Sequence, residues 1–239
     1  MLNKKKNKEI SIANYAPLLI LPSILTELVI QFLSLTIPGI LIIKSYQSSN
    51  ILFFILSLLI SIYLYQIILL FLSAIAYRLT SKPKTGEILT TKEMVLYLYA
   101  TSILIFVHRS LPRFTINMFP FPGYFFYRIC GAKIAINVNI LGIAHIFEPN
   151  LINIGRNTTL GNQALITPHI VKKFGKTLLG KIEIGNNVLV GAHSIIWPDV
   201  KIGDNSIVAE NSSVKPGTII PPNEIWGGNP AKFIKKLSK

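Results

Sequence analysis

The sequence predicts N-terminal transmembrane helices followed by a parallel β-helix, so that α-helices are combined with a β-solenoid. The chain of 239 residues is 51% hydrophobic. Its charged residues make up 14%, against roughly 25% in soluble domains. Its C-terminal half repeats an aliphatic residue every six positions. These observations predict a membrane domain over residues 1–130 and a β-helix domain over residues 131–239.

Two apolar stretches in the first half are long enough to span a membrane. Residues 51–77 carry no charged side chain, and about 20 apolar residues cross a bilayer. Residues 15–43 carry one charged residue, Glu27. They also contain Pro22 and Pro38, which predict a kinked span or a span preceded by an interfacial segment.

Three shorter features accompany these spans. Glu27 lies within the first span, and an acid within a membrane is a functional candidate by default. Pairing of Glu27 with Gln31 or Gln66 explains its presence equally well. Residues 94–108 are too short to cross and predict a helix lying in the membrane interface. Residues 119–126, FPFPGYFF, predict a proline-broken aromatic anchor at headgroup depth.

Basic residues predict the orientation, because cytoplasmic loops carry an excess of lysine and arginine. Four lysines precede the first span and four basic residues lie within 78–92, whereas the connector 44–50 contains only Lys44. We expect both the N-terminus and the C-terminal domain on the cytoplasmic side of the cytoplasmic membrane. The first apolar run is too long for a secretory signal, and no small-residue cleavage site follows it.

The formal net charge of +14 predicts an anionic partner. No basic stripe is interleaved with exposed aromatic residues, which argues against nucleic acid. Anionic lipid and a phosphorylated small molecule are the remaining classes. The single cysteine, Cys130, excludes an intrachain disulfide and suits a reducing compartment.

The six-residue period defines the second half. A helical stripe repeats every 3.6 residues, whereas a period of six suits a chain that turns a corner every six residues, as in a parallel β-helix. The triplet Ile154, Leu160 and Ile166 keeps the same period before an interruption. An earlier, looser triplet, Ile134, Ile140 and Ile146, adds roughly one more coil, so that about four coils are expected. The closing NPAKFIKKL predicts a short amphipathic helix that caps the last coil. The repeated positions are Ile134, Ile140, Ile146, Ile154, Leu160, Ile166, Ile184, Val190, Ile196, Ile202, Val208, Val214, Ile220 and Trp226.

The segments IGNNVLVGAHSIIWPDVKIG and WGGNPAKFIKKL resemble the last coils and the cap of hexapeptide-repeat acyltransferases. The resemblance covers about residues 131–239. It implies a left-handed β-helix, a homotrimer, and acyl-coenzyme A, in particular acetyl-coenzyme A, bound between neighbouring subunits. The segment GAKIAINVNI after a membrane-associated half is similar to the membrane-bound subgroup, including C-terminal regions of some poly-amino-acid synthetases.

The repeat stops after Ile166 and resumes at Ile184, with a lysine-rich passage between them. The TPH sequence at 167–169 resembles the histidine motif of that family, in which an inserted loop leaves the β-helix near a catalytic histidine. The resemblance implies that His169 is the general base. A histidine that titrates near neutrality can take the proton of an acceptor hydroxyl, which is otherwise a poor nucleophile. Pro168 departs from the family pattern, and the alternative is a polar corner residue.

The other titratable residues receive lesser roles. Glu148 is a candidate for orienting His169 across coils, as carboxylates orient histidine bases elsewhere. His193 occupies an ordinary repeat position, where exposure to solvent is expected. One branch of β-helix enzymes resembling carbonic anhydrase binds zinc through three histidines, two of them close together in one repeat. Because His145, His169 and His193 are evenly far apart, we expect no metal.

The resemblance also implies the cosubstrate contacts. Lysines near the C-terminus stand where the phosphates of coenzyme A lie in the family, and lysine suits phosphate as a point charge. A solvated lysine face or contact with anionic lipid is the alternative. The turn after the last coil would line the pantetheine arm. The candidate residues are Lys215, Trp226, Gly227, Gly228, Lys232 and Lys235.

These inferences combine into one hypothesis. The chain would be an integral membrane acyltransferase that moves an acetyl group from acyl-coenzyme A to a hydroxyl of a membrane-associated sugar, glycan precursor or lipid. The alternatives are an amide-forming transferase of the same fold, a non-catalytic trimeric membrane scaffold, and a zinc lyase.

Overall fold

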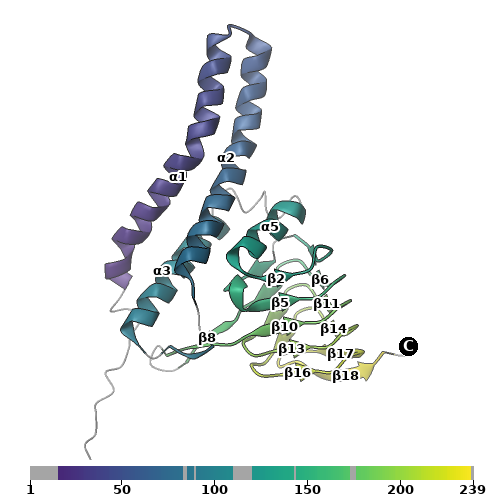
Figure 1. Cartoon of the computed structure of the whole chain (residues 1–239). Coiled ribbons are helices and arrows are strands. Elements are labelled where there is room, and N and C mark those ends of the chain that lie inside the picture. Colours follow the sequence, from purple (N-terminus) through teal and green to yellow (C-terminus); the bar gives the residue numbers. More distant parts are fainter. Residues whose placement is uncertain are drawn as a thin grey trace, which may run out of the picture.

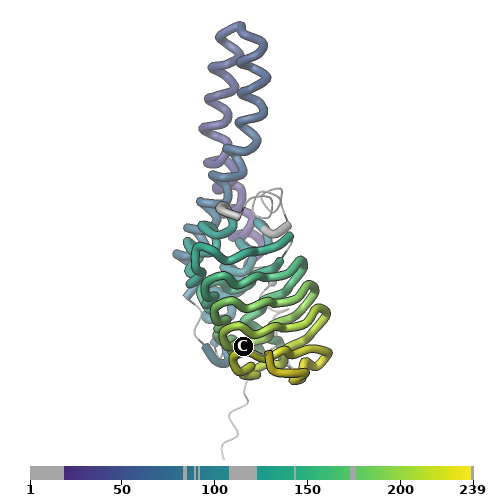
Figure 2. Tube along the Cα trace, turned by 90° about the vertical axis from the view of Figure 1, so that its right-hand side faces the viewer, coloured from purple at the N-terminus to yellow at the C-terminus, as the bar shows by residue number. Residues whose placement is uncertain are grey.

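The computed structural model describes residues 16–82, 85–88, 90–109, 120–142, 144–172 and 176–237. Its N-terminal part is helical, and its C-terminal part is a coil of short strands (Figure 1). Figure 2 shows the successive turns of this coil stacked below the helices.

Helices α1 (Ala16–Gln47) and α2 (Ile51–Thr80) pack against each other as a hairpin. The side chain of Asn50 begins α2 by accepting a hydrogen bond from the Phe53 amide at 3.1 Å. Near the tip, the hydroxyls of Ser45 and Ser57 lie 2.6 Å apart. The serine contact joins the two helices, whose outer faces are apolar.

Helix α1 accommodates its prolines and its acid without interruption. It continues through Pro22 and Pro38, and the carbonyl of Pro38 accepts a hydrogen bond from Ser61 on α2 at 3.3 Å. Glu27 accepts a hydrogen bond from Gln31 Nε2 at 3.2 Å, one helical turn along. The structure thus gives Glu27 one of the two partners expected from the sequence.

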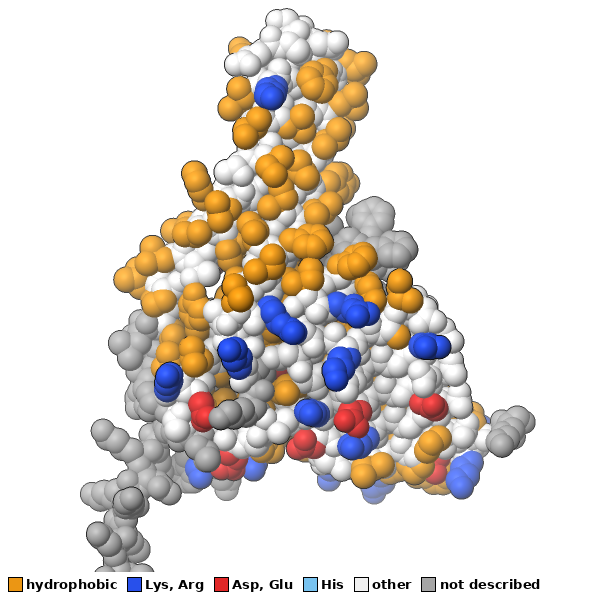
Figure 3. All heavy atoms as spheres, in the orientation of Figure 1, with side chains coloured by type: hydrophobic (Ala, Val, Ile, Leu, Met, Phe, Trp, Pro, Cys, Tyr) orange, Lys and Arg blue, Asp and Glu red, His pale blue; other side chains and the backbone are white. Residues whose placement is uncertain are grey.

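Hydrophobic side chains cover the outside of the hairpin (Figure 3). Both helices are long and apolar enough to cross a membrane, by length and composition. Only 17% and 28% of their most apolar windows are buried, unlike a core helix of a soluble domain. Most of this outward apolar surface is therefore left uncovered by the residues that the structure describes.

Helix α3 (Thr91–Arg109) packs against both α1 and α2. It buries Met94, Leu104 and Val107 completely or nearly so. The helix expected over residues 94–108 is therefore present and slightly longer, and its position in a membrane interface stays a prediction.

Helix α5 (Pro120–Cys130) covers the first turn of the β-helix. Phe126, Tyr127 and Cys130 are at most 2% exposed and belong to one core with the inward residues of the β-helix. The expected break at the prolines is wrong from Pro120 onward, because these residues form one helix whose buried side chains close the open end of the β-helix. Its position at headgroup depth stays a prediction. Phe119 lies outside the described residues.

Fourteen short strands form three parallel sheets along the axis of the β-helix. Among the described residues, four turns contain a strand of every sheet and a fifth contains two. The first sheet consists of β2 (Lys133–Ile134), β5 (Ile152–Ile154), β10 (Ile182–Ile184), β13 (Lys201–Ile202) and β16 (Ile219–Ile220). The second consists of β3 (Asn139–Ile140), β6 (Thr159–Leu160), β11 (Leu189–Val190), β14 (Ile207–Val208) and β17 (Glu224–Gly227). The third consists of β4 (His145–Ile146), β7 (Leu165–Ile166), β12 (Ile195–Ile196) and β15 (Ser213–Val214).

The residues that recur every six positions in the sequence pair with their equivalents in the next turn of the β-helix. Ile154, Ile184 and Ile202 are direct partners in the first sheet, and Leu160 and Val190 are partners in the second. All five are 4% exposed or less. Each aliphatic residue therefore lies between its counterparts one turn above and below, at the spacing of about 4.8 Å between neighbouring strands.

One corner of the β-helix carries a ladder of asparagine side chains. Asn157, Asn187, Asn205 and Asn223 have φ values of 54° to 61°, a left-handed conformation that asparagine tolerates better than most residues. Each side-chain amide in the series donates to the next at 3.0 to 3.2 Å. The ladder joins the turns on their outer surface, and Asn137 begins it by donating to Asn157.

The C-terminus forms a strand and not the expected capping helix. β18 (Lys232–Lys236) pairs antiparallel with β17. The edge of β17 offers unpaired backbone groups, and pairing with them holds residues 232–236 as a strand. All five residues of β18 are exposed, so the strand does not cover the core as an amphipathic helix would.

The inserted passage forms a second, smaller sheet beside the helical half. β8 (His169–Val171) and β9 (Thr177–Leu179) form an antiparallel pair, and β1 (Gly86–Glu87) adds to the outer edge of β9. Lys172 reinforces this contact through an ion pair with Glu87 at 3.2 Å. The insertion is thus tied to the segment that follows α2.

Candidate active site

The candidate site is built where the β-helix departs from regularity, at Glu148 and His169. His145 of β4 pairs with Leu165 of β7, so the chain segments that leave these two strands lie side by side. Glu148 follows β4 by two residues and His169 follows β7 by three. Sheet register therefore brings together two residues 21 positions apart.

Glu148 is a buried carboxylate in an unusual backbone conformation. Glu148 is only 2% exposed. Its backbone φ of 39° lies in the left-handed region. A left-handed residue other than glycine costs of order 1 kcal/mol or more and persists where its surroundings enforce it. Here the following turn, Pro149–Leu151, is enforced by Asn150, which accepts from Tyr77 at 3.1 Å and donates to Ser81 at 3.2 Å.

The two residues form a dyad. His169 Nδ1 lies 2.9 Å from Glu148 Oε2, and the His169 side chain is 27% exposed. Because a carboxylate only accepts hydrogen bonds, Nδ1 carries the proton and Nε2 of the neutral ring carries the lone pair. The Thr167 hydroxyl donates to the carbonyl oxygen of His169 at 3.2 Å and lies 3.3 Å from Nδ1. The contact between Glu148 and His169 expected from the sequence is present in the structure.

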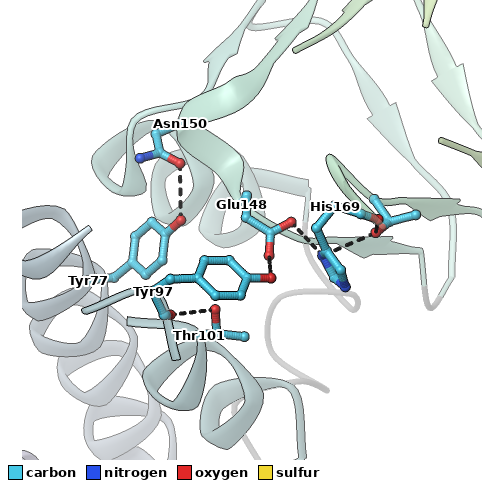
Figure 4. A network of polar contacts seen from close by, with 7 residues as sticks. Tyr77, Tyr97, Thr101, Glu148, Asn150 and His169 are labelled. Carbon is cyan, nitrogen blue, oxygen red and sulfur yellow. Dashed lines mark hydrogen bonds and ion pairs between the residues drawn. The ribbon is translucent and has the colours of Figure 1, made fainter. Parts of the chain in front are cut away.

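A third side chain, Tyr97 of α3, completes the cluster (Figure 4). Its hydroxyl donates to Glu148 Oε1 at 3.0 Å, across a separation of 51 residues. Its ring meets the His169 ring edge to face, with centroids 6.2 Å apart. Phe147 packs against another side of the imidazole with centroids 5.9 Å apart. Tyr97 is not among the residues predicted from the sequence, because no motif or period marks it.

Electrostatic effects on His169 oppose each other. Burial lowers the pKa of His169, whereas the hydrogen bond to Glu148 and the charge of Glu148 raise it, and the net result is above the ordinary 6.5. Burial, followed by the charge of Glu148 and the hydrogen bond to it, raises the pKa of Tyr97 far above its ordinary value. Tyr97 therefore stays a protonated donor, and His169 is the group of the cluster that exchanges a proton near neutral pH.

The residues expected to bind the cosubstrate lie at the other end of the β-helix. Trp226 and Gly227 belong to β17 in the fifth turn, and Gly227 pairs with Lys232 of β18. Lys235 pairs with Ile225, Lys215 follows β15, and Gly228 follows β17. His169 leaves the second turn, whereas Lys215 follows the fourth turn and the other residues belong to or follow the fifth, so two to three turns, or about 10–14 Å along the axis, separate them. One chain therefore does not bring these residues beside the dyad.

The other two histidines of the expected set lie at β4 and at a corner of the β-helix. His193 is exposed at a corner and has a φ of 58°. His145 stacks on Phe147, with centroids 6.3 Å apart. Within the described parts of the chain, no three histidine, cysteine or acidic side chains gather as a metal-binding group.

Comparisons with known proteins concern mainly the β-helix. Residues 181–223 match the family model described as "Bacterial transferase hexapeptide (six repeats)". Together with the three parallel sheets, this match indicates a left-handed β-helix and supports the resemblance to hexapeptide-repeat transferases.

Three curated relatives match parts of the chain. Protein CapG of Staphylococcus aureus is 45% identical over 97 residues, covering 38% of this chain and 55% of the relative. Gamma carbonic anhydrase 2, mitochondrial, of Arabidopsis thaliana is 33% identical over 90 residues, covering 36% and 26%. Delta-poly-L-ornithine synthetase of Acinetobacter baumannii is 28% identical over 109 residues, covering 46% and 8%. The chain thus spans about half or less of the length of these relatives.

Among solved structures, a maltose O-acetyltransferase from Clostridium difficile 630 has a TM-score of 0.47 and 20% identity, covering 60% of this chain and 89% of that one.

Proposed function

We propose that the chain is a membrane-bound, acyl-coenzyme A-dependent acyltransferase in which His169 is the general base. The acceptor would be a hydroxyl of a membrane-associated sugar, glycan precursor or lipid, and the acyl group an acetyl group. The observation that carries this proposal is the Glu148–His169 dyad, with its 2.9 Å contact, at the base of an insertion in a hexapeptide-repeat β-helix.

The dyad suits transfer to a hydroxyl. The acceptor oxygen attacks the carbonyl carbon of the thioester while its proton passes to Nε2 of His169. Glu148 stabilises the imidazolium that forms, because its carboxylate already accepts the proton of Nδ1. Collapse of the tetrahedral intermediate breaks the carbon–sulfur bond, and the leaving thiolate takes the proton from Nε2. Backbone N–H groups of a neighbouring turn are candidates for holding the oxyanion.

The helical half supports an acceptor held at a membrane. The α1–α2 hairpin exposes an apolar surface to its surroundings, and α3 packs directly on it. Tyr97 of α3 reaches the dyad, so the candidate site lies against the membrane-associated half.

A homotrimer accounts for the separation between the two candidate sites within one chain. The dyad of one subunit would act on an acyl group whose coenzyme A portion is bound by Lys215, Trp226, Gly227, Gly228, Lys232 and Lys235 of a neighbouring subunit. Lys215, Lys232 and Lys235 are exposed, as a phosphate-binding lysine must be before the ligand arrives.

Calorimetry of the detergent-purified chain with coenzyme A and acetyl-coenzyme A tests the proposal without knowledge of the acceptor. We expect binding of both in the wild type, and retained binding in His169→Ala because the base does not hold the cosubstrate. A screen of acceptors should then give turnover that depends on His169. A trimeric preparation that binds neither compound would overturn the proposal and favour the non-catalytic scaffold.

The gamma carbonic anhydrase relative motivates a second candidate, a zinc lyase. Metal analysis of the purified protein separates the two candidates. Stoichiometric zinc together with hydration of carbon dioxide, both abolished by His169→Ala, would favour the lyase. We expect neither.

A further inference from the structure

The hydroxyl of Tyr97 binds the carboxylate that holds the proposed base, and not the base itself, which suggests a positioning role. Its hydroxyl donates to Glu148 Oε1 at 3.0 Å, while the other carboxylate oxygen, Oε2, lies 2.9 Å from His169 Nδ1. The two oxygens of one buried carboxylate are thus divided between Tyr97 and His169. Rotation of the carboxylate away from His169 would break both hydrogen bonds.

We propose that Tyr97 is a positioning residue, through which helix α3 of the membrane-associated half holds the Glu148–His169 dyad in its reactive geometry. This inference rests on the proposed function, since it concerns the same base. It extends that function by making the dyad dependent on a helix outside the β-helix.

The packing around Tyr97 supports this role. Met94 on the same helix is completely buried in a small core with Ile88, Leu151 and Leu179. These residues come from the segment after β1, from the turn that follows Glu148, and from β9 of the insertion. The core therefore fixes α3 relative to both chain segments that supply the dyad, and Tyr97 packs against it.

Charged and titratable groups on every neighbouring element bear on the titration of His169. Tyr97 belongs to α3 and Tyr77 to α2, and both interact electrostatically with Glu148. His145 of β4 stacks on Phe147, whose ring meets His169. The Lys172–Glu87 ion pair lies at the far end of β8. Of these groups, Tyr97 has a hydrogen bond to the carboxylate that holds His169.

Replacement by phenylalanine gives a signed prediction. In Tyr97→Phe the carboxylate loses a donor, so its negative charge is less stabilised and it interacts more strongly with a protonated His169. The pKa of His169 should rise by about half a unit, and the acid limb of the pH–rate profile should move to higher pH. Loss of the Glu148 charge would move it the opposite way.

The matched control is Tyr99→Phe. Tyr99 lies two residues along the same helix, but its hydroxyl contacts Thr26 of α1 and not the dyad. We expect the His169 pKa and the pH–rate profile of this variant to match those of the wild type. A change common to both variants would mean that removing either hydroxyl merely loosens α3, and would overturn the positioning role.

The titration of His169 can be measured directly by NMR of the full chain in detergent, with the histidine Cε1 labelled with carbon-13. The chain has 4 histidines, and His169→Gln assigns the relevant signal. This readout does not require acyl transfer. A shift specific to Tyr97→Phe in a protein that fails to bind coenzyme A would retain the positioning role and reject the proposed function. An unshifted His169 in an active Tyr97→Phe protein would reject only the positioning role.

Discussion

The side chain of Glu148 determines how His169 can act. The carboxylate accepts the Nδ1 proton at 2.9 Å, and this hydrogen bond selects the tautomer in which Nε2 is free to take a proton. The same carboxylate raises the pKa of His169 against the opposing effect of burial. The carboxylate therefore makes His169 a stronger base, but it also increases the fraction of His169 that is protonated at neutral pH.

Glu148→Gln separates these two effects. The amide keeps an oxygen that can accept from Nδ1 but removes the charge, so the pKa of His169 should fall. Because only unprotonated His169 accepts the acceptor's proton, activity rises with pH through this pKa, and the acid limb should move to lower pH in the variant. The plateau rate should drop by about 10²-fold, since the imidazolium loses its counter-ion.

The measurement is a pH–rate profile of acyl transfer, once an acceptor is known. Glu210→Gln serves as the control, because Glu210 is an exposed carboxylate at a corner of the β-helix. An acid limb that stays in place in Glu148→Gln would show that the carboxylate does not set the titration of the base.

At the scale of elements, the period of the sequence determined what could be predicted. Ile154, Ile184 and Ile202 were expected to point inward, and they stack in one sheet. The prediction of a capping helix was wrong because residues 232–236 pair with the edge of β17. Such pairing depends on which strand lies beside the segment in the fold, and a local amphipathic pattern does not contain that information. Tyr97 could not be predicted for a related reason. Its contact with Glu148 depends on how α3 packs against the β-helix, and this packing leaves no repeat in the sequence.

The asparagine ladder predicts a graded loss of stability at Asn205. Asn205 donates to Asn223 at 3.2 Å, accepts from Asn187 at 3.0 Å, and has a φ of 58°. Asn205→Gly loses the hydrogen bonds but tolerates the conformation, and should lower the free energy of unfolding by about 1 kcal/mol. Asn205→Ala adds left-handed strain of roughly 1–2 kcal/mol and should be the less stable of the two.

Thermal unfolding of the three proteins in one detergent ranks them, with the wild type expected highest and Asn205→Ala lowest. Equal midpoints for the glycine and alanine variants would mean that the left-handed conformation at this corner contributes no strain.

At the scale of the whole molecule, the candidate site lies where the two halves of the chain meet. The β-helix supplies Glu148, the insertion supplies His169, and the helical half supplies Tyr97. β1 joins the insertion by pairing with β9, so the meeting of the halves includes backbone as well as side chains. In the proposed function, a site assembled in this way would act close to the base of the apolar hairpin, where a membrane-held acceptor would be presented.

The hairpin should cross the membrane twice and place its tip opposite the β-helix. Gln47 ends α1 and is exposed, and Glu210 is exposed on the β-helix.

The single native cysteine, Cys130, is completely buried, so Cys130→Ser provides a background for introduced cysteines. In intact cells, a membrane-impermeant maleimide should label Gln47→Cys but not Glu210→Cys, and permeabilisation should make the second site reactive. This result follows from the distribution of basic residues, with four lysines before α1 and only Lys44 in the connector at the tip. If Gln47→Cys becomes reactive only after permeabilisation, the hairpin does not cross as proposed. If Glu210→Cys reacts in intact cells, the orientation is reversed.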